Sequence, residues 1–362
     1  MSEPMDFNKR RYAHLKRQME EHELDMVMLT GGAGMGARLQ RLTGSTSGTA
    51  VIIPIDGNPA HFVYGVDYNS TLDESWLPVK LIESRSAALP LITGYANGYL
   101  KDGARIGVNL GSLNHTGYES YSKELKGDLV DISGDIIPEV WFGLYPGEIK
   151  FHRTVSKLAD IGCSAVREAM RPGITETELA AEANYAMQRN GAETLSFQTI
   201  VSTGERSAYS HGWPTPRKLK DGEFVLVDLG PTIEGYAADE TRTYLLGDDL
   251  KKERMMEAMD KSVQAVIDHV RPGASCRELD AISRRVLKEH GFPDYPHSLG
   301  HPLSGFVTPQ LSKTSKVILK PGHLFTVEPG IYLPGYGGVR MEENVVVTED
   351  GYEQLTRGQR LL

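Results

Sequence analysis

Hydrophobic and polar positions follow two periods in the first part of the chain, and each change of period predicts a new element. Residues 10–24 carry apolar side chains at helical spacing, and residues 104–127 read as a strand followed by a helix. Apolar runs of strand length occupy residues 25–29, 49–55 and 60–66. The pattern predicts an α/β domain over residues 1–146, which ends where Pro146 and Gly147 punctuate the chain.

Residues 147–362 repeat their own pattern at an offset of 100 residues. AVREAMRPGITETELAA at 165–181 aligns with AVIDHVRPGASCRELDA at 265–281, and DGEFVLVDLG at 221–230 aligns with PGHLFTVEPG at 321–330. Each copy places helices before an apolar strand, so a duplicated α+β domain with a pseudo-twofold axis is predicted. Equivalent strands are then expected to meet at the middle of one sheet.

Each copy contains two helices separated by an Arg-Pro-Gly break. The second helix of each copy begins at a hydroxyl residue, Thr175 or Ser275, and a glutamate follows three positions later, which is the capping-box arrangement. These helices are predicted to end at Gly191 and Gly291, because glycine favours the left-handed conformation of a helix C-terminus.

Acidic residues stand at related positions in the two copies. Asp228 ends an apolar strand, where an unpaired carboxylate would be costly, and the repeat sets it opposite Glu328. Asp239 belongs to the next strand of the first copy, and Glu342 is its counterpart, three residues out of register. Four converging carboxylates cannot all stay ionised without a cation. The repeat therefore predicts a metal site.

Imidazole ligands are available in HSLGHPLSG, which offers His297 and His301 between the two pairs of acids. One imidazole with four carboxylates favours manganese, cobalt or iron(II), or zinc where supply favours it. Two ions about 3.5 to 4 Å apart would balance this charge, with a bridging carboxylate and a water between them. The alternative, that these acids are solvated hairpin residues, is disfavoured because they lie in apolar strands at repeat-related positions.

Composition narrows the class of partner. The net charge of -9 and the lack of a long basic run give no footprint for nucleic acid or an anionic membrane, so a small peptide or amide is expected. The apolar runs are shorter than a membrane span and the start has no apolar signal core, which favours a cytoplasmic protein. Cys163 and Cys276 are expected to be buried or idle thiols. The glycine-rich residues 31–39 lack the Lys-Ser/Thr of a phosphate loop and the spacing of a dinucleotide fingerprint.

The segments DLGPTIEGYAADETRT, GH, TVEPGIY and GGVRMEENVVVTEDGYEQLT resemble the signature segments of the pita-bread metallopeptidases, the group of methionine aminopeptidase, aminopeptidase P and prolidase. With the α/β domain in front, the resemblance is closest to prolidase and aminopeptidase P. It implies a creatinase/prolidase-type N-terminal domain over residues 1–146 and a pita-bread catalytic domain over residues 147–362. It also implies two divalent ions per chain, with manganese expected first. The implied metal ligands are Asp228, Asp239, His301, Glu328 and Glu342.

The resemblance also assigns roles in peptide hydrolysis. Glu328 is expected to act as the base that takes a proton from the attacking water. His211 and His297 fall on the family's substrate-binding histidines and are expected to bind the substrate carbonyl and the oxyanion. Thr241 and Thr243 are expected to orient a carboxylate ligand.

One loop departs from the family pattern. Relatives place a histidine seven residues after the histidine ligand, and prolidases that accept only dipeptides commonly have an arginine just beyond it; here Thr308 and Gln310 stand nearby. A neutral amide is a weaker carboxylate anchor than an arginine, although Arg340, Arg217 or an arginine of a partner chain could replace it.

Three hypotheses follow from these features. The first is an Xaa-Pro peptidase of the prolidase or aminopeptidase P type. The second keeps the metals but replaces the peptide with a small non-peptide amide or cyclic substrate, and the altered loop is its motivation. The third is a non-catalytic binding module, which is disfavoured because all five ligands are present. The resemblance also implies a homodimer.

Overall fold

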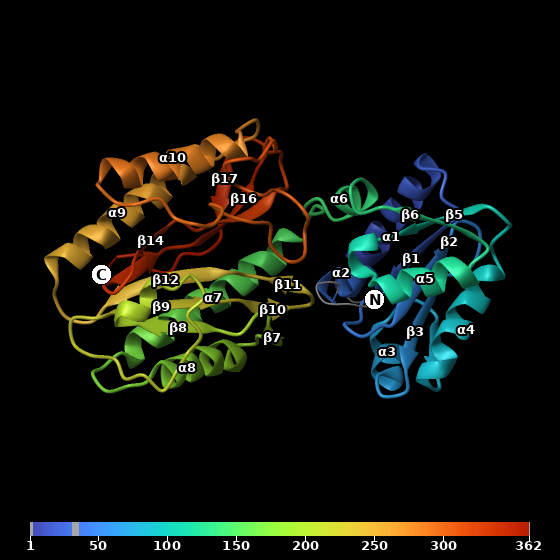
Figure 1. The fold of residues 1–362 in the computed structure, drawn as a ribbon, viewed down its shortest axis with the longest axis horizontal. Helices are drawn as coiled ribbons and strands as arrows, with labels where there is room; N and C mark the ends of the chain where they lie inside the picture. The colour runs from blue at the N-terminus through green and yellow to red at the C-terminus, as the bar shows by residue number, and fades with distance from the viewer. Residues whose placement is uncertain (1–2, 31–35, 362) are drawn as a thin grey trace. The chain divides into compact units, whose positions relative to one another are not determined.

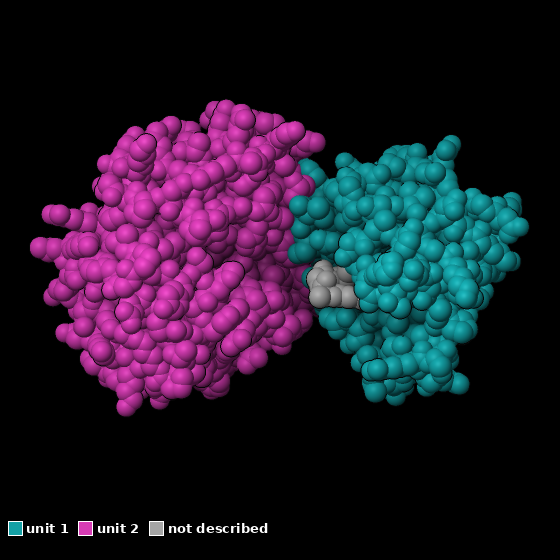
Figure 2. Space-filling model, viewed as in Figure 1, with its two compact units in different colours: residues 1–142, 305–307 teal, residues 143–304, 308–362 magenta. Residues whose placement is uncertain are grey.

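The computed structural model describes residues 3–30 and 36–361 of the chain. Two compact units are present: Met1–Phe142 with Gly305–Val307, and Gly143–Ser304 with Thr308–Leu362 (Figure 2). Most of the glycine-rich segment, residues 31–35, lies outside the described residues. Within the described part of the chain, no helix has the length and apolar character needed to cross a membrane.

A six-stranded mixed sheet organises the first unit, with strand order β4-β3-β2-β1-β5-β6 (Figure 1). Its central strand β1 pairs antiparallel with β2 and parallel with β5. The predicted strands are confirmed. The sequence pattern did not predict β4 and β6, because partly exposed residues interrupt their apolar positions. The strands are β1 (Met26–Thr30), β2 (Ala50–Pro54), β3 (Ala60–Tyr64), β4 (Val79–Ile82), β5 (Ala104–Val108) and β6 (Gly127–Asp131).

Helices cover both faces of this sheet. Because side chains alternate along a strand, Val27 and Leu29 of β1 face a core shared with α1, α2 and α6, whereas Met26 and Met28 face a core shared with α4. The predicted α/β class is therefore confirmed. The helices are α1 (Glu3–Glu21), α2 (Gly36–Thr43), α3 (Tyr68–Glu74), α4 (Arg85–Asn97), η1 (Leu110–Ser112), α5 (His115–Glu124) and α6 (Ile136–Val140).

The second unit shows the predicted repeat. The helix pair α7 and α8 packs against strands of the first copy, and the pair α9 and α10 packs mainly against strands of the second (Figure 1). Thr175 forms a capping box with Glu178 at the start of α8, and Gly191 follows that helix with φ +110°. Ser275 caps α10, and Gly291 follows it with φ +82°. The helices are α7 (Ile149–Ala169), α8 (Glu176–Arg189), η2 (Gly204–Ala208), α9 (Leu250–Ile267) and α10 (Cys276–Glu289).

The two copies do not share one hydrogen-bonded sheet, so that expectation is wrong. The first copy forms the ladder β12-β9-β8, and the second forms β13-β16-β17. They meet where β12 lies against β15 and β16, and there the Glu342 amide donates to the Thr241 carbonyl over 3.0 Å. The strands are β7 (Thr194–Leu195), β8 (Ile200–Thr203), β9 (Phe224–Leu229), β10 (Pro231–Ile233), β11 (Tyr236–Ala237), β12 (Glu240–Leu245), β13 (Leu324–Val327), β14 (Gly330–Leu333), β15 (Gly337–Arg340), β16 (Glu343–Val347) and β17 (Tyr352–Gln354).

The two cysteines take no part in a disulfide or in the site described next. Cys163 on α7 and Cys276 at the start of α10 are free and buried, as predicted.

Candidate metal centre

The four acidic residues of the predicted site lie at or beside the strands where the two copies meet. Asp228 is in β9, Asp239 immediately precedes β12, Glu328 immediately follows β13, and Glu342 joins β15 to β16. Together with His301 they line one cavity of about 430 Å³. Residues that are far apart in the sequence therefore converge because the strands carrying them pack together.

Backbone pairing brings His301 to this cavity. The Thr326 amide donates to the His301 carbonyl over 2.9 Å, and the His301 amide donates to the Thr326 hydroxyl over 3.1 Å. Gly300 permits this approach, since a Cβ there would lie 1.8 Å from the Thr326 carbonyl oxygen. The His301 Nε2 atom consequently lies 3.4 Å from carboxylate oxygens of both Asp239 and Glu328.

The donor atoms fit divalent cations. Asp239, His301 and Glu342 each offer one ligand atom, and these atoms lie within 4.8 Å of one another. Asp228 Oδ1 and Glu342 Oε1 are buried and have no hydrogen-bond partner among the described residues. Unpartnered carboxylate oxygens beside an imidazole form the oxygen-rich set that manganese, cobalt and iron(II) accept.

Burial and mutual repulsion perturb these acids. Burial raises the pKa of Asp228 to about 7, opposed by Arg340 and reinforced by Asp239 and Glu328. Burial also raises the pKa of Glu342 far above its ordinary value, and the neighbouring carboxylates add to this effect. The positive charge of Arg340 is therefore insufficient to keep all of these carboxyl groups ionised. A bound metal cation would lower their pKa values and favour the ionised carboxylates.

The imidazole of His301 shows the opposite response to the same carboxylates. Burial lowers its pKa, but the hydrogen bond that the ring donates to Asp239 and the charge of Glu328 outweigh that effect and raise the pKa to about 10. The acids therefore attract positive charge to the position of this imidazole.

Arg340 lines the same cavity and contacts its acidic cluster. Its guanidinium donates to Asp228 Oδ2 over 2.5 Å and to Thr241 Oγ1 over 3.0 Å. It also donates to the Ser210 carbonyl and the Tyr332 hydroxyl, each over 3.0 Å. Arg340 is almost fully buried, and its bond to Asp228 fixes one oxygen of that carboxylate.

The two threonines of the TRT sequence differ in what they contact. The Thr241 hydroxyl donates to Glu342 Oε2 over 2.7 Å, as expected for a residue that orients a carboxylate. Thr243 contacts no carboxylate directly; its hydroxyl donates to the Arg340 carbonyl over 2.9 Å and accepts from the Arg340 amide. The reason is that β15 lies opposite this part of β12 and presents its backbone to the side chain.

His211 and His297 both line the cavity but are held differently. His297 Nε2 lies 2.9 Å from the Tyr332 hydroxyl, and its Nδ1 lies 2.8 Å from the Ser298 carbonyl oxygen. Burial lowers the pKa of His297 to about 4, which keeps the ring neutral at pH 7. His211 is exposed and lies beside the ring of Trp213, with 6.3 Å between ring centroids.

Sequence reasoning did not identify the apolar wall of the cavity. Phe197, Ile200 and Trp213 form that wall next to the acidic cluster. The available signal was Trp213, which stands two residues after His211 in YSHGWPTPR. A partly exposed tryptophan beside a candidate binding residue indicates a recognition surface.

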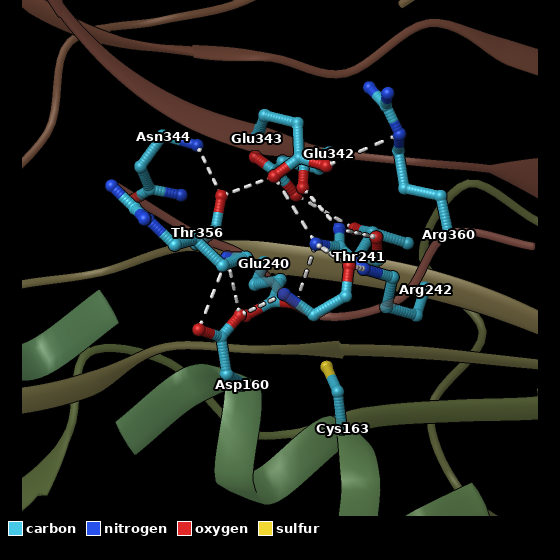
Figure 3. A network of polar contacts seen from close by, with 12 residues as sticks. Asp160, Cys163, Glu240, Thr241, Arg242, Glu342, Glu343, Asn344, Thr356 and Arg360 are labelled. Carbon is cyan, nitrogen blue, oxygen red and sulfur yellow. Dashed lines mark hydrogen bonds and ion pairs between the residues drawn. The ribbon is translucent and has the colours of Figure 1, made fainter. Parts of the chain in front are cut away.

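A second polar network lies on the other side of β12 (Figure 3). The buried Arg242 guanidinium donates to the carbonyls of Thr241 over 3.0 Å and Glu342 over 2.6 Å. It also lies 2.9 Å from Glu240 and 3.2 Å from Glu343. Arg242 thus joins the main chain of β12 to the main chain at Glu342, just before β16.

Comparison with known proteins agrees with this geometry. Residues 150–349 match metallopeptidase family M24, and residues 11–139 match the creatinase/prolidase N-terminal domain. An Xaa-Pro dipeptidase of Pyrococcus furiosus is 31% identical, with 98% of this chain and 99% of the relative covered.

Solved structures give the same result. The prolidase from Pyrococcus furiosus has a TM-score of 0.84 at 29% identity and covers 95% of this chain and 100% of its own. The prolidase from Thermococcus sibiricus has a TM-score of 0.87 at 26% identity, with 98% of this chain and 99% of its own covered. With its acidic cluster and its duplicated catalytic unit, this chain belongs to metallopeptidase family M24 and carries a creatinase/prolidase N-terminal domain.

Proposed function

We propose that this metallopeptidase cleaves the bond before proline in short Xaa-Pro peptides. The observation that carries the proposal is the cavity in which Asp239, His301 and Glu342 cluster beside an apolar wall. The names of the Pyrococcus furiosus relatives, an Xaa-Pro dipeptidase and a prolidase, support the substrate class. The apolar wall suits a proline ring, which has no hydrogen-bonding group to satisfy.

Family membership implies divalent metal ions, and we propose two per chain, with manganese preferred over cobalt, zinc or iron. When bound, such ions would lower the pKa of a coordinated water and polarise the substrate carbonyl. The residues that would hold them are Asp228, Asp239, His301, Glu328 and Glu342.

The remaining roles fall to side chains of the cavity. Glu328, which lines the cavity, is proposed to take a proton from the attacking water and return it to the leaving nitrogen. His211 and His297 are proposed to bind the substrate carbonyl and the developing oxyanion. Arg340 stays a proposed substrate contact, although four of its N–H groups already donate to protein atoms.

The test is a substrate panel on the manganese-loaded protein. Xaa-Pro dipeptides are expected to be cleaved much faster than Ala-Ala, and chelation should abolish the activity until manganese is restored. Cleavage of a small non-peptide amide in place of every Xaa-Pro peptide would replace this proposal with the second hypothesis. Metal analysis is expected to find close to two ions per chain.

We also propose that the protein is a homodimer in which the N-terminal domain of one chain overhangs the active site of the other. The resemblance to the prolidase group supports this proposal.

A further inference from the structure

Glu176 is a fully buried carboxylate at the first position of α8. Its Oε1 atom accepts from the Thr203 amide over 2.8 Å and from the Thr203 hydroxyl over 3.0 Å. Its Oε2 atom accepts from the Thr215 amide over 3.0 Å and from the Thr215 hydroxyl over 2.6 Å. A single carboxylate therefore binds both ends of the segment 203–215.

Arg206 extends this connection into the segment. Its Nε atom lies 3.2 Å from each oxygen of Glu176, and its Nη2 atom donates to the Trp213 carbonyl over 2.7 Å. The N-terminus of α8 adds favourable electrostatics for the buried carboxylate. Charge-assisted hydrogen bonds of this kind are stronger than bonds between neutral groups, so the contacts constrain the segment tightly.

His211 lies within this segment, and no described residue hydrogen-bonds its ring. The position of the ring therefore depends on the backbone that carries it and on its contact with the Trp213 ring. On one side of His211, Arg340 donates a hydrogen bond to the Ser210 carbonyl. On the other side, the backbone at Gly212 packs closely against Ser202, since a Cβ at Gly212 would lie 2.7 Å from the Ser202 side chain. The ends of the segment depend on Glu176.

The second copy of the repeat shows that the fold alone does not require this carboxylate. Thr175 forms an isolated antiparallel β-bridge with Lys218 in the first copy. Ser275 and Ile318, each 100 residues later, form the same β-bridge in the second copy. The residue equivalent to Glu176 in the second copy is a cysteine, Cys276, and α10 forms without a carboxylate at that position. The carboxylate of Glu176 is thus present in the first copy, which contains His211, and absent from the equivalent position of the second copy.

We propose that Glu176 is a positioning residue that holds the segment 203–215 so that His211 faces the substrate. This role rests on the proposed function of His211. Glu176 itself lines no part of the cavity and touches no reacting atom; it acts through the two ends of the segment.

The test compares Glu176→Gln with Glu178→Gln in the manganese-loaded full chain. Glu178 is exposed and stands in the same turn of α8, and glutamine can still serve as its capping-box partner, so it is a matched control. Glu176→Gln is expected to lower kcat/KM for Ala-Pro by about 10- to 100-fold, because a displaced binding group loses near-attack geometry. Glu178→Gln should stay within about 2-fold of wild type.

A double-mutant cycle separates positioning from general stability. In a His211→Ala background, the loss caused by Glu176→Gln is expected to be clearly smaller than in wild type, since only Ser210 and Trp213 of the segment then still line the cavity. Equal losses in both backgrounds would overturn the proposal.

Amide hydrogen exchange tests the same proposal without catalysis. Glu176→Gln should speed exchange across residues 203–215, whereas Glu178→Gln should leave it at the wild-type rate. If the segment stays equally protected in both variants, Glu176 does not position it. If wild-type protein cleaves no Xaa-Pro peptide, the proposed function fails, and the exchange comparison still decides the role of Glu176.

Discussion

Glu342 and Glu343 are adjacent glutamates with opposite environments. Glu342 faces the cavity and accepts from Thr241, whereas Glu343 turns to the other side and meets Arg242 and the Thr356 hydroxyl (Figure 3). Consecutive side chains of extended backbone point to opposite faces, which separates the two carboxylates. Of these two glutamates, Glu342 is therefore the one that clusters with Asp239 and His301.

At the residue scale, Asp239→Asn and Glu328→Gln are expected to lower kcat by at least about 100-fold. In the proposed function, Asp239→Asn removes the charge of a metal ligand, and Glu328→Gln removes a metal ligand that is also the proton acceptor. The thermal midpoint of the metal-free forms should stay near that of metal-free wild type. Steady-state kinetics and metal analysis check this, with the exposed Glu349→Gln as control. Full activity of thoroughly metal-free wild-type protein would contradict it.

A second residue-scale prediction concerns His61, which is completely buried in β3 and lies 3.1 Å from the Ser75 hydroxyl. Burial lowers its pKa from 6.5 to about 4. As the pH falls from about 6.5 to 4, the unfolded chain takes up this proton before the folded chain does, so stability present above pH 6.5 is lost. The loss is roughly 3 kcal/mol.

Unfolding of wild type and His61→Gln between pH 7 and pH 4 measures this contribution. The variant should lose less stability on acidification than wild type, and the exposed His115→Gln should behave as wild type does. Identical pH profiles for wild type and His61→Gln would show that His61 contributes nothing to acid sensitivity.

At the scale of elements, the loop over residues 301–312 separates this chain from the usual prolidase pattern. Gln310 is exposed and donates to the Ser298 hydroxyl over 3.0 Å, while Ser298 lines the cavity. A neutral amide thus stands near the cavity where dipeptide-specific prolidases commonly have an arginine. Arg217 does not offer a free substitute, because it pairs with Glu223 over 2.6 Å.

This loop predicts weak discrimination by substrate length. Without a charged anchor, the free carboxylate of a dipeptide loses about 1.5 to 3 kcal/mol of binding, so the preference for dipeptides should fall roughly 10- to 150-fold. Ala-Pro-amide and Ala-Pro-Ala should then be cleaved nearly as well as Ala-Pro. Steady-state kinetics on the three substrates decide the matter, and a several-hundred-fold preference for Ala-Pro would refute this interpretation of the loop.

At the scale of the whole molecule, the proposed homodimer predicts a mass twice that of the chain in light scattering at micromolar concentration. Activity per chain should fall on dilution below the dissociation constant, because the partner's N-terminal domain helps to complete the site in this proposal. A monomer with undiminished activity would exclude that arrangement.

The sequence by itself determined the elements and the repeat. Apolar runs predicted the central strands of the first unit, and the offset of 100 residues predicted matching helix pairs, caps and terminal glycines. It also identified Asp239, His301 and Glu342 as candidates before their atoms were known to lie within 4.8 Å of one another. These features are readable because burial periodicity, capping and duplication are properties of local sequence.

Only the tertiary structure decided which member of each pair of similar residues, Thr241 or Thr243 and Glu342 or Glu343, belongs to the acidic cluster of the cavity. Thr241 meets Glu342 while Thr243 meets the backbone of Arg340, and Glu176 reaches Thr203 and Thr215 across a segment whose sequence gives no sign of the contact. Such contacts depend on how strands and helices that are distant in sequence pack against one another. A local pattern reports whether a side chain is buried, but only packing determines which group it meets there.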